Sequence, residues 1–487
     1  MEQRTPATVA RNSGSGQADA TDLASRIAKG ELSAADATEA ALARIEAVNP
    51  ALNAVVQRMD DEARTAAAAA DRAVAAGREP GPLHGVPITV KINIDQKGQA
   101  TDNGTVLARD TIATEDNPVV ANLRRAGAIV VGRTNAPVYS MRWFTDNTLH
   151  GPTFNPWSRD HTVGGSSGGA AASVASGMVP LAHGNDIGGS VRYPAACNGL
   201  SGLRPSYGRV PSFNGTAAKG SGPGSVASQL MAVQGPIGLS VRDVELGFTA
   251  MAVPSLDDPR TMPFVITPKE TPRRAAVVPE SAWPFCHDDV ARAVFEAGER
   301  LSRAGWDVVE ATLPNLTELY RMWGAIVVPE LIATLEPVLD RSGDENIVTS
   351  VGFWKQAFGQ VSMADTVAAI ARRHGILREW LHLLEEFPVL LMPVSLMPAF
   401  PRLADVQSAE MTSHIMQAQS PMLVISVLGL PGLSVPVTMS KTGASGEPAQ
   451  LPLGVQVVAA PWREDMCFAA GADIEAAQPL FCPIDPK

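Results

Sequence analysis

The chain has 487 residues, with 39 basic and 50 acidic side chains, so its formal net charge is −11. An acidic chain without clustered Lys and Arg lacks the electrostatic pattern of a nucleic-acid-binding protein. Hydrophobic residues make up 45% of the chain and charged residues 18%, which is enough apolar material for a packed interior. No run of 18 apolar residues and no basic amphipathic helix is evident, so we expect no membrane partner. These features favour a protein that handles a small molecule.

The cysteines and the N-terminal residues indicate the compartment. Cys197, Cys286, Cys467 and Cys482 are scattered without CxxC spacing, and four in 487 residues is far below the density of a disulfide scaffold. We therefore expect free thiols. The first residues lack the apolar segment of a secretory signal, so the sequence favours the cytoplasm.

The N-terminal part is predicted to be a tail followed by helices. Residues 1–18 are polar and rich in Gly and Ser, which predicts a disordered tail. Apolar periodicity then predicts three helices. The first covers about 21–29, the second begins at the cap pattern of residues 33–36 and runs to about 48, and the third is the alanine-rich stretch 60–76.

Strand patterns occur both early and late in the chain. Residues 85–95 alternate and are β-branched, and 128–133 form a short apolar run after a helix near 119–126. The other expected elements are a surface connection at 266–279, helices at 288–304, 316–339 (kinked or broken at Pro329) and 363–386, and strands at 389–392, 432–437 and 454–458. Strands that alternate with helices in this way predict an α/β fold with one largely parallel or mixed sheet. We expect a single domain over residues 19–487.

Two glycine-rich segments each present a serine. Residues 164–169 (GGSSGG) contain Ser166, and residues 183–194 contain Ser190. Glycine permits positive φ and lets a substrate approach the backbone closely. Successive backbone N–H groups of such a turn can face one concavity, as in an oxyanion hole that stabilises the charge on an attacked carbonyl. The turn contains Ile187, Gly188, Gly189 and Ser190.

A serine hydroxyl needs a base to take its proton, and histidine is the usual choice. None of the eight histidines accompanies a G-x-S-x-G elbow, because Ser190 lies in the sequence G-G-S-V-R. Lys91 is the best candidate, since it lies in an otherwise apolar strand where burial would lower the pKa of its amine. Lysine replaces histidine in serine catalysis on unrelated folds.

These segments together resemble the amidase signature family. The run 164–205 resembles the signature segment of the family, and residues 85–91 (GVPITVK) resemble its G-[IV]-P-x-x-x-K element. Further similarities, in the order of the family, lie at 32–36, 132–135, 155–157, 429–436 and 453–456. The resemblance covers nearly the whole chain, and it implies one large mixed sheet with helices on both faces.

The resemblance also implies roles for the site residues. Ser190 is similar to the acylating serine, Ser166 to a bridging serine with an unusual cis peptide bond, and Lys91 to the base. The backbone of Ile187, Gly188 and Gly189 matches the oxyanion hole. The implied reaction is acyl transfer through an acyl-enzyme on Ser190, which water then hydrolyses, and it requires no metal or organic cofactor.

Neighbouring residues are expected to support this site. The residue after the lysine is commonly acidic in the family and is Ile92 here; on a strand it should point away from Lys91. Asp186 and Arg192 are expected to form a structural ion pair that holds the nucleophile loop. Ser167 is expected to support the proton relay by hydrogen bonding.

One loop departs from the family in its composition. The family loop M-G-S-S-T-E corresponds to residues 141–146, Met-Arg-Trp-Phe-Thr-Asp. Trp143 and Phe144 in place of small polar residues favour an apolar or aromatic substrate pocket that includes Met141. The alternative is that both rings belong to ordinary core packing.

The sequence thus predicts an amide hydrolase for small, apolar or aryl amides, with anilides or carbamates as further substrates, and a homodimer would be unsurprising. One alternative is the glutaminase subunit of a tRNA-dependent amidotransferase, which belongs to the same family. Trp143 and Phe144 argue against it, because a glutamine site should stay polar there. A phosphate-binding module is disfavoured, because GGSSGG lacks the Lys-Ser/Thr ending of a P-loop.

Overall fold

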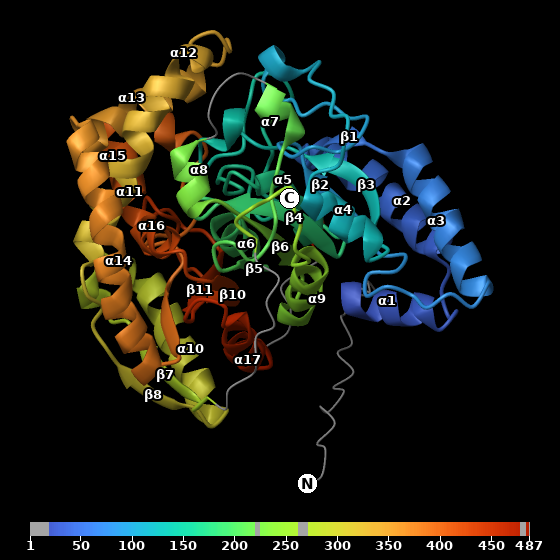
Figure 1. Ribbon diagram of the computed structural model, residues 1–487. Helices are drawn as coiled ribbons and strands as arrows, with labels where there is room; N and C mark the ends of the chain where they lie inside the picture. Colours follow the sequence, from blue (N-terminus) through green and yellow to red (C-terminus); the bar gives the residue numbers. More distant parts are fainter. Residues whose placement is uncertain (1–18, 220–224, 262–270, 478–483, 487) are drawn as a thin grey trace.

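The computed structural model describes residues 19–219, 225–261, 271–477 and 484–486 (Figure 1). The expected tail, residues 1–18, and Cys482 lie outside this part of the chain. Of the remaining cysteines, Cys197 and Cys467 are buried and Cys286 is partly buried, and all three are free thiols, as expected.

All strands of the described residues belong to one 11-stranded sheet in the order β1-β3-β2-β4-β6-β5-β10-β11-β9-β7-β8. Their bounds are β1 (Val55–Arg58), β2 (Pro87–Lys91), β3 (Ile129–Thr134), β4 (Leu181–Asp186), β5 (Ser201–Arg204), β6 (Val233–Gly238), β7 (Arg274–Val277), β8 (Asp307–Glu310), β9 (Val389–Pro393), β10 (Gly432–Met439) and β11 (Pro452–Val458). The sheet is mixed: β2 is parallel to β3 and β4, and β7 is parallel to β8 and β9, whereas the other pairs are antiparallel.

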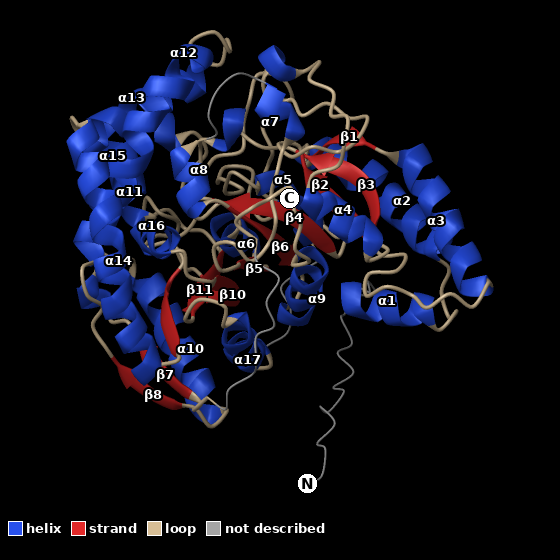
Figure 2. Cartoon of the chain, in the orientation of Figure 1, coloured by secondary structure: helices blue, strands red, loops and turns tan. Residues whose placement is uncertain are grey.

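Helices cover both faces of this sheet (Figure 2). Their bounds are α1 (Ala20–Ala28), α2 (Ala34–Leu52), α3 (Asp60–Ala75), α4 (Pro118–Arg125), α5 (Gly168–Ala175), α6 (Arg192–Asn198), α7 (Gly215–Lys219), α8 (Val226–Met231), α9 (Val241–Met251), α10 (Asp288–Arg303), α11 (Leu316–Glu330), α12 (Glu336–Leu339), α13 (Glu345–Phe358), α14 (Met363–Glu386), α15 (Ala409–Ala418), α16 (Ser420–Leu428) and α17 (Glu464–Glu475). The α/β class and the mixed, two-sided sheet predicted from the sequence are confirmed.

The central strands are apolar without interruption because both of their faces are buried. In β9 the four residues Val389–Met392 are all 0% exposed, and they join two different core clusters in alternation. Successive side chains of a strand point to opposite faces of the sheet, so the residues of β9 pack alternately against the helices on one face and on the other. One layer contains α9, α10 and α17, and the other contains α5, α6 and α16.

One sequence-based expectation is wrong in this part of the chain. The segment 266–279 was expected to be a surface connection, but Arg274–Val277 forms β7, which lies between β8 and β9 in the sheet; residues 262–270 lie outside the described chain. The prolines that flank this short strand dominate the local pattern.

The segment 316–339 was expected to be a helix kinked or broken at Pro329, and it stays helical through this residue but changes its type of helix directly after it. The α-helix continues to Glu330 and is followed by a π-helical turn, Leu331–Leu335, before α12. The wider π-helical turn thus begins two residues after Pro329, which has no backbone N–H to donate.

Within the described residues, the helical segment Leu316–Leu339 is long and apolar enough to cross a membrane by length and composition alone. Its side chains Leu319, Trp323 and Ile326 are at most 2% exposed and belong to the core cluster beside α14 and α16. These contacts are those of a core helix.

A close backbone contact of α5 gives a test of the fold. A Cβ atom at Gly169 would lie 2.5 Å from the backbone N of Asn135 and 2.7 Å from the backbone O of Ala54, so no side-chain rotation can relieve the clash. We expect Gly169→Ala to lower the free energy of unfolding by roughly 1–3 kcal/mol or more, as overpacking does. The measurement is the urea midpoint.

The matched control is Gly352→Ala in α13, where a Cβ atom would meet nothing within 4 Å. Alanine is the better helix former, so this variant should gain about 0.5–1 kcal/mol. Equal midpoints for the two variants would contradict the packing described around α5.

Candidate active site

The candidate site lies where two neighbouring parallel strands end. Lys91 is the last residue of β2, and Asn185 and Asp186 are the last residues of β4. The carboxyl ends of parallel strands meet at one edge of a sheet, which is where α/β proteins bind their ligands. The loop after β4 leads directly to Ser190 and α6, so the strand positions bring the lysine and the second serine segment together.

Lys91 is fully buried, with a 0% exposed side chain. Its Nζ lies 2.7 Å from Ser166 Oγ and donates to Asn185 Oδ1, also at 2.7 Å. Burial lowers the pKa of Lys91 well below its ordinary value of 10.5, and the charge of Asp186 only partly opposes this. The lowered pKa predicted from the apolar strand is confirmed, and the amine can be neutral with a lone pair for Ser166. Ile92, the next residue, is buried as well, and the hydrogen-bond partners of Lys91 Nζ are Ser166 and Asn185.

Asn185 is a contact of Lys91 that sequence reasoning missed. Its Nδ2 donates to Asn93 Oδ1 at 2.9 Å, and Asn93 Nδ2 donates to Ser140 Oγ at 2.9 Å. This chain fixes the direction of the Asn185 amide, so that its oxygen faces Lys91. The signal available in the sequence was its position, because Asn185 lies next to Asp186 at the end of the same strand.

The two glycine-rich segments that contain Ser166 and Ser190 are joined by a backbone hydrogen bond. The Gly165–Ser166 peptide bond is cis, as the family resemblance implied. Ser167 precedes α5, and its N–H donates to the carbonyl O of Ser190 at 3.2 Å. The Ser167 hydroxyl lies 3.4 Å from the backbone N and O of Asn185. In the described part of the chain, no hydrogen bond joins the side chains of Ser166 and Ser190, which are 1% and 6% exposed.

Asp186 holds the loop that carries Ser190. Its carboxylate accepts from Arg192 Nε at 3.0 Å and Nη2 at 2.9 Å, from Arg204 at 3.3 Å, and from the N–H groups of Gly189 and Val191. Burial alone would raise the pKa of Asp186, but Arg192 and Arg204 hold it well below its ordinary value of 3.8. The expected ion pair with Arg192 is present, and Arg204 extends it to a third charge.

The turn before Ser190 exposes a different set of N–H groups from the one expected. Gly189 N–H is 2.8 Å from Asp186 Oδ1 and is therefore already used. The N–H groups of Ile187, Gly188 and Ser190 have no hydrogen-bond partner among the described residues. Gly189 has φ +104°, a conformation that other residues rarely adopt, so its contribution is to the shape of the turn. The sequence pattern could not show which N–H the aspartate takes.

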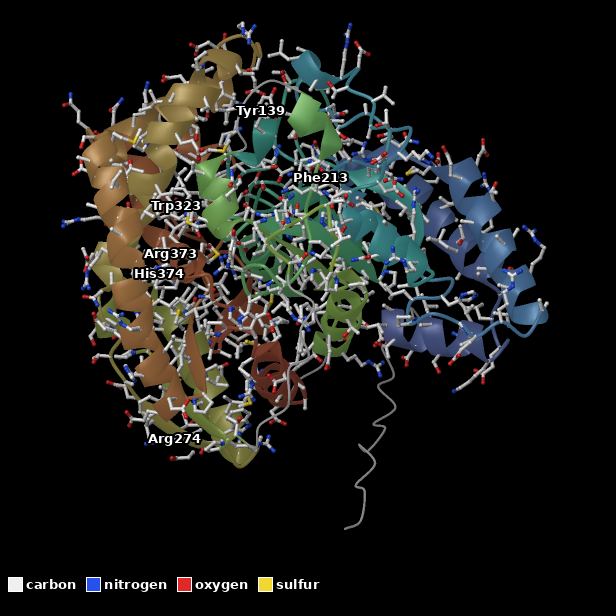
Figure 3. The ribbon with its side chains drawn as sticks, in the orientation of Figure 1. Tyr139, Phe213, Arg274, Trp323, Arg373 and His374 are labelled. Carbon is white, nitrogen blue, oxygen red and sulfur yellow. The ribbon has the colours of Figure 1, made fainter. Side chains whose placement is uncertain are left out.

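A cavity of about 250 Å³ opens beside Ser190, Ile187 and Gly188. Met141 and Trp143 line it, as expected, and Trp323 of α11 and Trp354 of α13 complete an aromatic wall. The ring centroid of Trp143 lies 6.2 Å from that of Trp323 and 5.5 Å from that of Trp354. In Figure 3, Trp323 lies on the side of α11 that faces α8.

Phe144 does not line this cavity. Its side chain is 3% exposed and belongs to the hydrophobic core, which agrees with the alternative of ordinary core packing. Trp143 fits both alternatives, core packing and pocket lining, because it is only 5% exposed and also lines the cavity. Trp323 and Trp354 lie some 180 residues or more after Trp143 in the chain, and their pairing depends on helix packing that local patterns do not encode.

His183 and Cys197 lie near this segment in sequence but are unsuited to proton transfer. Burial lowers the pKa of His183 to about 3, and its Nε2 is 2.8 Å from Gln234 Oε1. Burial also raises the pKa of the Cys197 thiol above its ordinary range. Among the residues described around Ser166, Lys91 is the group whose contact and lowered pKa suit a base.

Comparisons with known proteins show the family to which the chain is similar. The sequence matches the protein-family model described as Amidase over residues 36–468. It is 40% identical over 466 residues to an indoleacetamide hydrolase of Bradyrhizobium diazoefficiens, covering 94% of this chain and 86% of that protein. It is 31% identical over 472 residues to an acylamidase of Rhodococcus erythropolis, covering 94% and 95%.

A solved structure matches over nearly the whole length as well. A bacterial aryl acylamidase belonging to the amidase signature enzymes superposes with a TM-score of 0.80 at 25% identity, covering 95% of this chain and 96% of that chain. The chain therefore belongs to the amidase signature family and is an enzyme that hydrolyses amide C–N bonds.

Proposed function

We propose that the protein hydrolyses small aryl or apolar amides through an acyl-enzyme on Ser190, with Ser166 as proton relay and Lys91 as base. The observation that carries this proposal is the 2.7 Å contact between Ser166 Oγ and the Nζ of a fully buried Lys91. A neutral amine can accept a proton from a hydroxyl, whereas a charged one cannot.

In the proposed first half-reaction, Ser190 Oγ attacks the amide carbonyl and its proton passes to Ser166, whose own proton passes to Lys91. The tetrahedral intermediate then collapses, the C–N bond breaks, and the reversed relay delivers the proton to the departing amine. Water attacks the resulting ester by the same route and releases the carboxylic acid. Catalytic hydrogen bonds often tighten only when substrate is bound, so we expect the contact between the two serines to form in that complex.

The oxyanion in this mechanism is assigned to backbone donors. The N–H groups of Ile187, Gly188 and Ser190 are without partners among the described residues and border the cavity at Ser190. Preorganised donors of this kind contribute about 3–4 kcal/mol each to transition-state stabilisation. We therefore replace Gly189 by Ser190 in the set of donors first expected from the sequence.

The aromatic wall supports a planar, apolar substrate group. Trp143, Trp323 and Trp354 present ring surface to the cavity, and their spacing suits contact with another aromatic ring. The curated relatives named above include an indoleacetamide hydrolase and an acylamidase, so we propose arylacetamides, with indole-3-acetamide as the first compound to test and anilides next. The cytoplasmic location, a homodimer and a single domain over residues 19–487 stay predictions from the sequence.

A substrate panel tests the proposed reaction. Indole-3-acetamide, phenylacetamide, an acetanilide, an aryl carbamate and glutamine are incubated with the wild type, Ser190→Ala and Lys91→Ala, and ammonia or amine release is measured. We expect release from the aryl amides by the wild type only, with rates at least about 10³-fold lower in both variants.

Each other outcome of the panel has a defined meaning. Activity that survives Ser190→Ala would show that the nucleophile is wrong. Hydrolysis of glutamine alone would instead favour the glutaminase subunit of a tRNA-dependent amidotransferase.

The pH profile tests the role of Lys91. Asn185→Asp places a carboxylate where an amide oxygen now lies 2.7 Å from Lys91 Nζ. A negative charge there stabilises the protonated amine and raises its pKa, so the acid limb of kcat/KM should move to higher pH by about one to three units. Asn185→Ala is the control, since it removes the same hydrogen bond without adding charge. An unchanged acid limb in Asn185→Asp would contradict the assignment of Lys91 as the base.

A further inference from the structure

Two indole N–H groups bind the carbonyls of the turn that precedes Ser190. Trp323 Nε1 donates to the carbonyl O of Ile187 at 3.1 Å, and Trp143 Nε1 donates to the carbonyl O of Gly188 at 2.9 Å. The two tryptophans come from different parts of the chain, one from α11 and the other from the 141–146 loop. Their donors nonetheless bind consecutive peptide groups.

Each of these hydrogen bonds determines where the opposite end of a peptide group points. In a trans peptide the C=O and the following N–H point in opposite directions in one plane. Holding the Ile187 carbonyl therefore aims the N–H of Gly188, which is a partner-free donor beside the cavity. The next peptide group is held at both ends, by Trp143 at the Gly188 carbonyl and by Asp186 at the Gly189 N–H.

The turn needs such support because it is rich in glycine, and glycine leaves backbone dihedrals free. Trp323 also packs directly on it, since a Cβ atom at Gly188 would lie 3.1 Å from Trp323 Cζ2. The 141–146 loop that carries Trp143 is also held in place by hydrogen bonds. Its neighbour Arg142 makes two buried hydrogen bonds to Asp405, at 2.7 and 2.8 Å.

We propose that Trp143 and Trp323 are positioning residues for the turn that carries the oxyanion donors, in addition to forming the wall of the substrate cavity. This rests on the function proposed above and deepens it. Trp323 orients the Gly188 N–H directly. Trp143 holds the next peptide group, whose N–H is bound by Asp186, and so fixes the shape of the turn that leads to the Ser190 N–H. The same two rings thus contact the acyl or aryl group of the substrate and hold the backbone that stabilises its carbonyl during attack. Each indole has its N–H committed to the protein, so its ring surface is what remains for the substrate.

Replacing tryptophan by phenylalanine separates these two roles, because it keeps an aromatic ring and removes the N–H donor. In Trp143→Phe and Trp323→Phe we expect kcat to fall about 10–100-fold, since a loosened donor is misplaced in the transition state. The fall should be similar for phenylacetamide and for propionamide, because the defect lies at the carbonyl. A role in the wall alone would change KM for the aryl amide and leave kcat for propionamide as in the wild type.

Two control variants make the comparison sharper. Trp380→Phe also removes a buried indole donor, which binds the carbonyl O of Pro314 at 3.2 Å in another part of the fold, so it reports the general effect of losing such a bond. It should keep wild-type kcat. Trp354→Phe removes an indole from the cavity wall that makes no hydrogen bond to the turn within the described chain, and its effect should be on KM for the aryl amide.

A second readout concerns inhibitors. A phenylboronic acid forms a tetrahedral anionic adduct with a serine and so depends on the oxyanion donors, whereas phenylacetate, the expected product, does not. In Trp143→Phe and Trp323→Phe the boronic acid should bind about 10–100-fold more weakly and phenylacetate less than about threefold more weakly. Equal losses for both inhibitors, or an unchanged kcat, would overturn the proposal. Failure of the proposed function is a separate result, because it appears as activity that survives Ser190→Ala.

Discussion

The buried carboxylate of Asp186 is the interaction on which the candidate site depends. It is fully buried between two arginines, and it also accepts hydrogen bonds from two backbone N–H groups of the loop that contains Ser190. A buried charge is tolerated when its partners satisfy it, and removing one partner of such a pair typically costs about 3–5 kcal/mol. The shape of the nucleophile turn is therefore tied to the stability of the core.

The same network joins distant parts of the chain. Arg192 also donates to Ser426 Oγ and to the carbonyl O of Met422 in α16, and it contacts Gln456 of β11. Lys91 lies at the same sheet edge but has the opposite electrostatic surroundings, because its contacts are a hydroxyl and an amide oxygen. One buried group is thus held as an anion, whereas burial lowers the pKa of the neighbouring amine. Two neighbouring buried groups with opposite surroundings are what the proposed mechanism uses, one as a rigid frame and the other as a base.

The sequence predicted the parts of the site that are determined locally. Lys91 in an apolar strand, the GGSSGG segment and the turn before Ser190 are each visible within a few residues, and the structure brings these three segments together. Trp323 and Trp354 could not be predicted, because they reach the cavity through the packing of α11 and α13. The engaged N–H of Gly189 and the direction of the Asn185 amide depend on single hydrogen bonds, which no periodicity encodes.

The fold shows the same division between local and distant determinants. Helices with clear periodicity, such as α2, α10 and α14, occur where they were expected. The strand β7 was missed because four residues between prolines carry little pattern of their own, and it is defined by pairing with β8 and β9. Around Pro329 the chain stays helical, packed on α14 and α16, and the regular α-helix changes to a π-helical turn directly after the proline.

The strand order has a consequence for biosynthesis. β10 and β11, the last strands to leave the ribosome, occupy the middle of the sheet between β5 and β9. Lys91, Ser166 and Ser190 are all translated long before, but until residue 432 emerges the edge of β5 has no partner strand and the first half of the sheet stays open. An unpaired edge can pair with another chain and aggregate. A nascent chain therefore contains the proposed reacting residues for more than 200 residues of synthesis before β10 can pair with β5. During this interval the unpaired edge is exposed, and a chaperone would protect it from aggregation.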